Sequence, residues 1–129
     1  MLHVQLVSPE QVLYEGEADM VVVRTLGGGD IAFQTDHAPF VGALATWPVR
    51  VKTGTEQEQF AVHGGFIEVS GNRVSILSDV AELPDQIDVD RAGRAKAAAE
   101  EALKENPDDA DAVAALRRAE ARLVVADEV

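Results

Sequence analysis

A glycine-rich stretch followed by an acid and a histidine occupies Thr25–Phe40, with the sequence TLGGGDIAFQTDHAPF. Glycine-rich turns that open a helix bind phosphates, and a carboxylate beside an imidazole can serve as a general base. Here the glycines precede a short apolar run, without the Lys-Ser/Thr of a P-loop or the GxGxxG spacing of a dinucleotide site. We therefore interpret Gly27–Gly29 as a turn with positive φ angles.

The pair Asp36–His37 is likewise interpreted as part of a turn. A catalytic dyad needs a nucleophile and an orienting group beside it, and this stretch offers only Thr25 and Thr35. Asp and Pro are ordinary turn formers, and Pro39 follows directly. No catalytic residue is predicted.

Composition excludes several functional classes. The 129 residues are 47% hydrophobic, with a formal net charge of −12 and no cysteine. A strongly acidic chain does not suit nucleic acid or an anionic membrane surface, and the absence of cysteine excludes disulfides and thiolate zinc sites. His3, His37 and His63 show neither HxH nor HExxH spacing, so no metal site is predicted. No apolar run approaches a membrane span and the N-terminus resembles no targeting signal, so we expect an intracellular protein that meets a membrane only through partners.

The chain divides into two parts with different sequence patterns. Residues 1–84 are predicted to form strands. Apolar and polar residues alternate in LHVQLV (2–7) and WPVRVKTG (47–54), and ADMVVVRT (18–25) is a β-branched run. Two later runs meet at Gly71-Asn72, which suits a two-residue hairpin turn. Many short strands with glycine-containing turns indicate a sandwich or a barrel.

Residues 85–129 are rich in alanine and are predicted to form two helices. The first should run from a cap at Asp88 or Asp90 to about Glu105, and the second should start with Asn106 as cap and Pro107 in its first position. Narrow faces of small residues favour a close antiparallel hairpin. Because alanine buries little apolar surface, we expect the hairpin to be weakly held and detachable. The faces comprise Ala92, Ala95, Ala99, Ala102 and Leu103, then Val113, Leu116, Ala119 and Leu123.

Three arginines, Arg117, Arg118 and Arg122, form a basic patch in this acidic chain. Arg118 and Arg122 share a helix face, where like charges repel mildly unless an anion lies between them. Two interpretations stay open, a solvated face paired with Glu120 and a site for an anion or an acidic partner.

Taken in order, the blocks GGGDIAFQTDHAPFVGAL, AVHGGFIEVSGNRVSILSDVAE, IDVDRA and ALRRAEARLVVA resemble the epsilon subunits of bacterial F-type rotary ATP synthases. The resemblance spans essentially the whole chain. It implies an N-terminal ten-stranded β-sandwich (1–84) and a C-terminal antiparallel two-helix hairpin (85–129). It also implies a non-catalytic central-stalk subunit that couples proton translocation to ATP synthesis and inhibits ATP hydrolysis through its hairpin.

The resemblance further implies partners: the gamma subunit, the c-subunit ring and the alpha and beta subunits, at the cytoplasmic face of the bacterial cell membrane. The glycine-rich stretch and HAPF would share one end of the sandwich, with His37 toward gamma and Asp30 toward the ring. Arg117, Arg118 and Arg122 would meet an acidic loop of the beta subunits, a contact that the tail Asp127-Glu128 is expected to weaken. Ala32–Thr35 departs from the proline-containing run usual in the family.

ATP is implied as a regulatory ligand rather than a required cofactor. Ile87-Asp88-Val89-Asp90-Arg91-Ala92 fits the family's I/L-D-x-x-R-A nucleotide motif. Glu82 matches an acidic residue that recognises adenine, and Arg118 and Arg122 match arginines that reach the phosphates. A further arginine of ATP-binding members is Ala98 here, with Arg94 one turn away, so weak binding is expected. The alternative for Asp88 and Arg91 is a purely structural role as helix cap and brace.

Two other functions compete with this one. The first is a free-standing β-sandwich adaptor with a nucleotide-responsive hairpin, and the second is a small enzyme using Asp36 and His37. Co-purification with alpha, beta and gamma subunits would separate a stalk subunit from an adaptor. Trp47 receives no role from the sequence.

Overall fold

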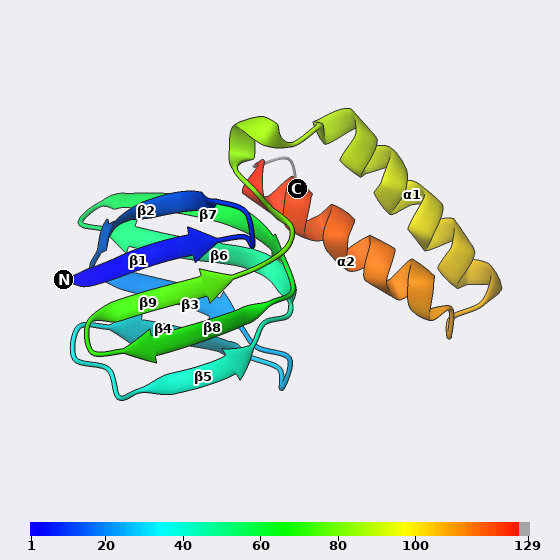
Figure 1. Ribbon diagram of the computed structural model, residues 1–129. Helices are drawn as coiled ribbons and strands as arrows, with labels where there is room; N and C mark the ends of the chain where they lie inside the picture. Colours follow the sequence, from blue (N-terminus) through cyan, green and yellow to red (C-terminus); the bar gives the residue numbers. More distant parts are fainter. Residues whose placement is uncertain (127–129) are drawn as a thin grey trace.

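The computed structural model describes residues 1–126, which form a β-sandwich followed by a helical hairpin (Figure 1). The predicted fold, ten strands and then two helices, is confirmed within this range. The strands are β1 (Leu2–Val7), β2 (Val12–Ala18), β3 (Met20–Arg24), β4 (Asp30–Gln34), β5 (Phe40–Ala43), β6 (Thr46–Thr53), β7 (Glu56–His63), β8 (Phe66–Ser70), β9 (Arg73–Leu77) and β10 (Ala81–Glu82). A short 3₁₀ turn, η1 (Pro84–Gln86), leads to α1 (Val89–Glu105) and α2 (Ala110–Val125).

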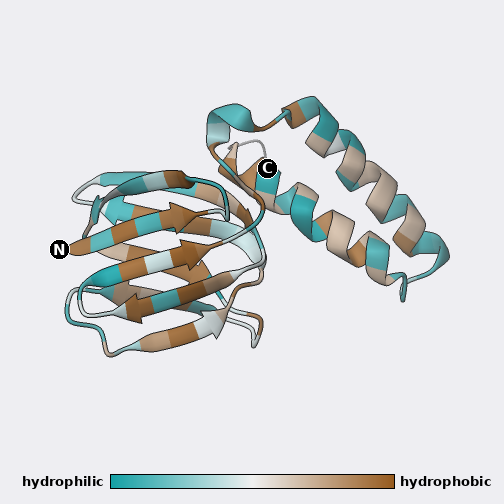
Figure 2. Cartoon of the chain, in the orientation of Figure 1, coloured by the Kyte–Doolittle hydropathy of each residue, from teal (hydrophilic) through white to brown (hydrophobic). Residues whose placement is uncertain are grey.

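The strands form two five-stranded sheets, in the orders β2-β1-β9-β8-β5 and β10-β7-β6-β3-β4. Neighbours pair antiparallel except β1 and β9, which run parallel. Alternate side chains of both sheets point inward, as the period of two in the sequence requires. The core between them contains Phe33, Phe60, Ile67 and Ile76, each no more than 1% exposed. Figure 2 shows this apolar character on the strands and a paler, more polar hairpin.

Both glycine turns contain positive φ angles as predicted, although Gly27 does not have one. Gly71 has a φ of 60° and sits between the paired residues Ser70 and Arg73. Gly28 and Gly29 have φ angles of 89° and 85° in the turn between β3 and β4. These conformations favour glycine because a side chain would crowd the backbone there.

One expectation about this region is wrong. The glycine turn precedes β4 while Asp36–His37 follows it, so the two features lie at opposite ends of the strand. Five residues at about 3.3 Å each separate them by roughly 17 Å. Asp30 and His37 therefore face different surroundings.

The first helix begins and ends as predicted. The Asp88 carboxylate accepts a hydrogen bond from the Arg91 backbone N–H at 3.1 Å, and α1 ends at Glu105. The predicted cap of the second helix is wrong: Asp109, not Asn106, accepts from the Ala112 N–H and caps α2. The Asn106 side chain instead accepts from the Asp108 N–H at 3.1 Å. This local turn competes with helix formation and delays the start of α2.

The second helix has two buried faces. One packs against α1, and the other packs against β6 and β7. A small apolar cluster of Ala61, Ile87 and Val125 lies at the second interface. The helix α1 lies on the far side of α2 from the sandwich (Figure 1). The hairpin is thus held to the sheet mainly through one helix, by few apolar side chains.

Candidate functional site

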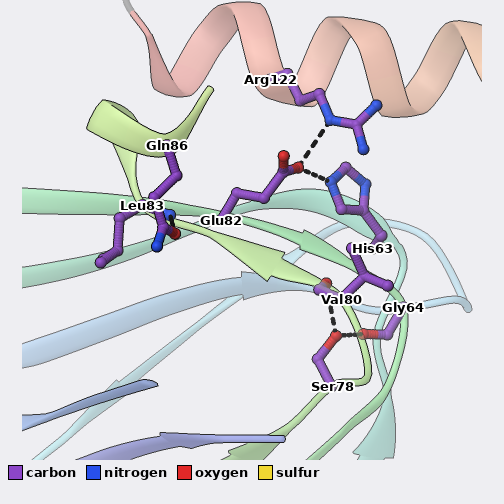
Figure 3. A network of polar contacts seen from close by, with 8 residues as sticks. All are labelled: His63, Gly64, Ser78, Val80, Glu82, Leu83, Gln86 and Arg122. Atoms are coloured by element: carbon purple, nitrogen blue, oxygen red, sulfur yellow. Dashed lines mark hydrogen bonds and ion pairs between the residues drawn. The ribbon is translucent and has the colours of Figure 1, made fainter. Parts of the chain in front are cut away.

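A chain of polar side chains joins α2 to the edge of the sheet (Figure 3). Arg122 Nε donates to Glu82 Oε1 at 2.7 Å, and His63 Nε2 lies 2.7 Å from the same oxygen. The side chain of His63 is 5% exposed, that of Glu82 23% and that of Arg122 29%. Hydrogen bonds to charged groups are stronger in such partly buried surroundings than at an exposed surface. One carboxylate oxygen therefore connects β7, β10 and α2.

The protonation states follow from these contacts. Burial alone would raise the pKa of Glu82, but hydrogen bonds from Arg122 and His63 outweigh it and hold that pKa below its ordinary value. The ionised carboxylate can only accept, so Nε2 of His63 carries a proton. Burial lowers the pKa of His63, and Arg122 and Arg118 lower it further against the opposing effect of Glu82. At neutral pH the imidazole is uncharged, and its buried Nδ1 has no hydrogen-bond partner within the described residues.

A cavity of about 440 Å³ opens beside this network, between the two helices and the segment that connects them to the sandwich. Six of the seven residues predicted to bind ATP line it, and Ile87 does not. Ile87 packs instead with Ala61 and Val125. The lining residues are Glu82, Gln86, Asp88, Arg91, Ala92, Ala95, Ala115, Arg118 and Arg122.

Three arginines and two acids, Glu82 and Asp88, line the cavity. Arg91 comes from α1 and Arg118 and Arg122 from the facing helix, so three guanidinium groups border one space. Guanidinium groups bind phosphates and carboxylates through paired, charge-assisted hydrogen bonds. The alanines between them leave room for a ligand. Asp88 also caps α1 here, so both interpretations of that residue are compatible.

The remaining predicted contact residues lie elsewhere. Arg117 lines a different, mostly apolar cavity of about 670 Å³, together with Leu26 and Phe66, whose exposed fractions are 69% and 59%. Asp30 pairs with Arg24 at 3.0 Å and with Arg50 at 3.7 Å. The predicted basic patch is therefore divided between two cavities.

His37 is not paired with Asp36. Its Nδ1 lies 2.6 Å from the backbone oxygen of Ala38, and its ring meets Phe33 edge-on. The backbone N–H of Asp36, whose φ is 66°, donates to Asn72 Oδ1 at 2.8 Å. The Asp36 carboxylate accepts from Asn72 Nδ2 at 3.4 Å. This geometry is that of a turn, as the sequence indicated. No group of three potential metal ligands occurs within residues 1–126.

Two features escaped the sequence interpretation. A single histidine in an alternating strand gave no signal that His63 would meet Glu82, 19 residues away, because only the β7–β10 pairing brings them together. Trp47 now has a structural role: the Arg24 guanidinium lies 4.2 Å from its ring centre, a cation–π contact.

Fold and site together define a β-sandwich that carries a helical hairpin with an arginine-lined pocket. Residues 1–84 match the family model described as "ATP synthase, Delta/Epsilon chain, beta-sandwich domain", and residues 85–127 match "ATP synthase, Delta/Epsilon chain, long alpha-helix domain". The chain belongs to the delta/epsilon chain family of ATP synthase.

Relatives and solved structures agree with this assignment. An ATP synthase epsilon chain of Brevibacillus brevis is 48% identical over 103 residues, which cover 79% of this chain and 77% of the relative. One from Halalkalibacterium halodurans is 45% identical over 129 residues, covering 97% and 96%. A chain in a Euglena gracilis mitochondrial ATP synthase structure shares the fold with a TM-score of 0.71 at 22% identity, over 98% of this chain and 78% of that one. Neither helix within residues 1–126 has the length and apolarity to cross a membrane.

Proposed function

We propose that this chain is a non-catalytic subunit of the central stalk of a bacterial F-type ATP synthase, bound at the cytoplasmic face of the membrane through the complex. The observation that carries the proposal is the family match over both parts of the chain. Two solved structures of similar fold come from an OSCP/F1/c-ring assembly and a central stalk/c-ring assembly. Co-purification of the tagged chain with alpha, beta and gamma subunits tests it. A chain recovered alone from cells that contain the complex would favour the free-standing adaptor.

The sandwich offers separate surfaces for two stalk partners. The end with the glycine turn carries Asp30 and the exposed Leu26, and we infer that it meets the c-subunit ring. His37, at the other end of β4, is the proposed contact with gamma. Cross-linking from cysteines placed at Leu26 and at His37 should capture different subunits. Capture of the same subunit by both positions would contradict this division.

The arginine-lined cavity is the proposed site for ATP, bound without hydrolysis. Arg91, Arg118 and Arg122 would hold the phosphates, and Glu82 would accept from the adenine amino group. Arg122 would use its Nη groups for a phosphate, because its Nε–H donates to Glu82. Isothermal titration should show saturable binding that weakens in Arg91→Ala. An absence of heat and of chemical-shift change at millimolar ATP would leave these residues structural.

Inhibition of ATP hydrolysis is proposed to use the same helix in an extended hairpin, with Arg117, Arg118 and Arg122 against an acidic loop of the beta subunits. Because Arg117 lies outside the nucleotide cavity, Arg117→Ala should relieve inhibition without changing ATP affinity. Neutralising all three should relieve inhibition further and leave assembly intact. An unchanged hydrolysis rate in the assembled triple variant would remove this role. The acidic tail Asp127-Glu128 lies outside the described residues.

A further inference from the structure

The imidazole of His63 belongs to the sandwich, yet it contacts Glu82, which together with Arg122 belongs to both the network and the nucleotide cavity. His63 does not line the cavity, whereas its partner Glu82 does. Figure 3 shows the ring on β7 directed toward α2, beside the Arg122 guanidinium. His63 is therefore placed to act on the cavity through Glu82 rather than on a ligand.

We propose that His63 is a positioning residue of this cavity: its Nε2–H holds Glu82, and Glu82 in turn holds Arg122 and the docked position of α2, until protonation of the imidazole releases them. The part concerning nucleotide affinity rests on the proposed ATP site. The part concerning helix docking stands on the contacts alone.

Protonation would upset the network in two ways. The buried Nδ1 would become an N–H donor, and no acceptor lies within reach of it among the described residues. The new cation would also share Glu82 Oε1 with Arg122, each nitrogen 2.7 Å from that oxygen. A buried donor without a partner and two cations on one oxygen are both costly in low dielectric.

All charged groups around the ring enter the balance. Glu82 on β10 favours the imidazolium, whereas Arg122 and Arg118 on α2 and burial beneath that helix oppose it. Asp79, which lines a cavity of about 460 Å³ together with His63, is a second acid near the ring. Burial and the two arginines of α2 lower the pKa of His63 below its ordinary value of 6.5, so we expect docking to favour the neutral imidazole. Docking is therefore strongest above pH 6.5 and weakens as pH falls below it, by up to about tenfold for each unit of pKa displacement.

Two substitutions separate hydrogen bonding from space filling. His63→Gln keeps a donor near the position of Nε2 but cannot titrate, and His63→Phe keeps the ring but lacks the donor. Because the chain has no cysteine, Glu68→Cys and Glu100→Cys, both at exposed sites, allow two spin labels to report the distance between β8 and α1. The measurement is made on the full chain at pH 8 and pH 5.5, with circular dichroism to verify folding.

The wild type should show one docked distance at pH 8 and a growing population of longer distances at pH 5.5. His63→Gln should remain docked at both pH values, and His63→Phe should be partly undocked at both. The proposal is overturned if His63→Gln follows the wild-type pH dependence, or if His63→Phe docks as fully as the wild type at pH 8.

ATP titration of the same proteins at both pH values tests the nucleotide part. The phosphate of ATP also titrates in this range, so the pH effect in His63→Gln serves as the baseline. Wild-type affinity should fall more than this baseline at pH 5.5. An equal fall in both proteins would overturn the link between His63 and the cavity. If no protein binds ATP at any pH, the ATP site itself fails, while the distance measurement still decides the role of His63 in docking.

Discussion

At the scale of single residues, one carboxylate oxygen of Glu82 connects three elements that lie far apart in the sequence. Arg122 and His63 both direct a nitrogen at it. The Nε–H of Arg122 is engaged by this oxygen, so Glu82 competes with an anionic ligand for one of the donors of that guanidinium. Ligand binding and helix docking therefore depend on the same residue.

Glu82 should make stability depend on pH in the acid range. Its pKa is lower in the folded protein than its ordinary value of 4.5, so the ionised form stabilises the fold. That contribution is complete above pH 4.5 and is lost as pH falls through the folded-state pKa. Urea unfolding at pH 6 and pH 3.5 should show a smaller pH effect in Glu82→Gln than in the wild type. An equal effect in both would show that Glu82 is not responsible.

At the scale of elements, the crossing from one sheet to the other at Gly64-Gly65 tolerates no side chain at its second position. Gly65 has a φ of 115°, and a β-carbon there would lie 2.1 Å from the Leu77 carbonyl oxygen. Gly64 has a φ of 85°, but a β-carbon at that position meets no atom within 4 Å. Both glycines have a positive φ, but only Gly65 lacks the room for a β-carbon.

Gly65→Ala should therefore be far more destabilising than Gly64→Ala. We expect a loss of about 3 kcal/mol or more for the first and about 1 kcal/mol for the second, which carries backbone strain alone. Thermal and urea unfolding of the two variants measure the difference. Similar losses would mean that the β7–β8 connection adjusts without strain.

The start of α2 provides a second test at this scale. Asp109→Ala removes the cap and should lower stability by about 1 kcal/mol. Asp108→Ala alters an exposed neighbour that contributes its backbone N–H to the turn, and it should change little. Amide exchange at the first turn of α2 should rise in the first variant only. A larger effect from Asp108→Ala would indicate that α2 begins at Pro107, as the sequence predicted.

The sequence predicted the type of nearly every element it addressed, and it failed where several local signals compete. Alternation defined the strands, and Asp88 marked the start of α1. Asn106 and Pro107 imitate a helix start, but the Asn side chain bonds to the nearby backbone and moves the cap to Asp109. Local signals alone do not decide between the two positions, because Asn106 and Asp109 are both favourable capping residues.

The candidate site shows the same division. The family resemblance located six of the nine residues that line the cavity, three of them in the motif Ile87–Ala92. Ile87 was assigned to the ligand but packs against Ala61, since its neighbours are set by the docking of α2. His63 could not be foreseen, because its partner comes from the β7–β10 pairing.

At the scale of the whole molecule, the apolar core belongs to the sandwich alone. Its buried members run from Leu2 to Ile76, whereas the contact with the hairpin rests on Ala61, Ile87 and Val125. Close-packed apolar burial is the main source of stability. The sandwich is thus stabilised by a large apolar core of its own, whereas the hairpin is attached to it by a small apolar cluster.

A chain of residues 1–84 should therefore fold without the hairpin. We expect strand-type circular dichroism, a cooperative thermal transition and retained binding to gamma. Compared with the full chain, the fragment should lose only the few apolar contacts with α2 and the hydrogen bond between Glu82 and Arg122. An unfolded fragment, or one that no longer binds gamma, would show that the two parts are not separable.

The parallel pairing of β1 with β9 sets an order of events during synthesis. His3 lies opposite Arg73, so β1 must wait for β9, one of the last strands of the sandwich, before its sheet is complete. Contacts between such distant segments form slowly, whereas α1 and α2 meet through a short turn. The sheet that contains β1 is thus complete only after β9 has been translated, whereas α2 rests on β6 and β7 of the other sheet. Nascent β1 and β2 spend that time with an open edge, the stage at which this protein is most exposed to aggregation.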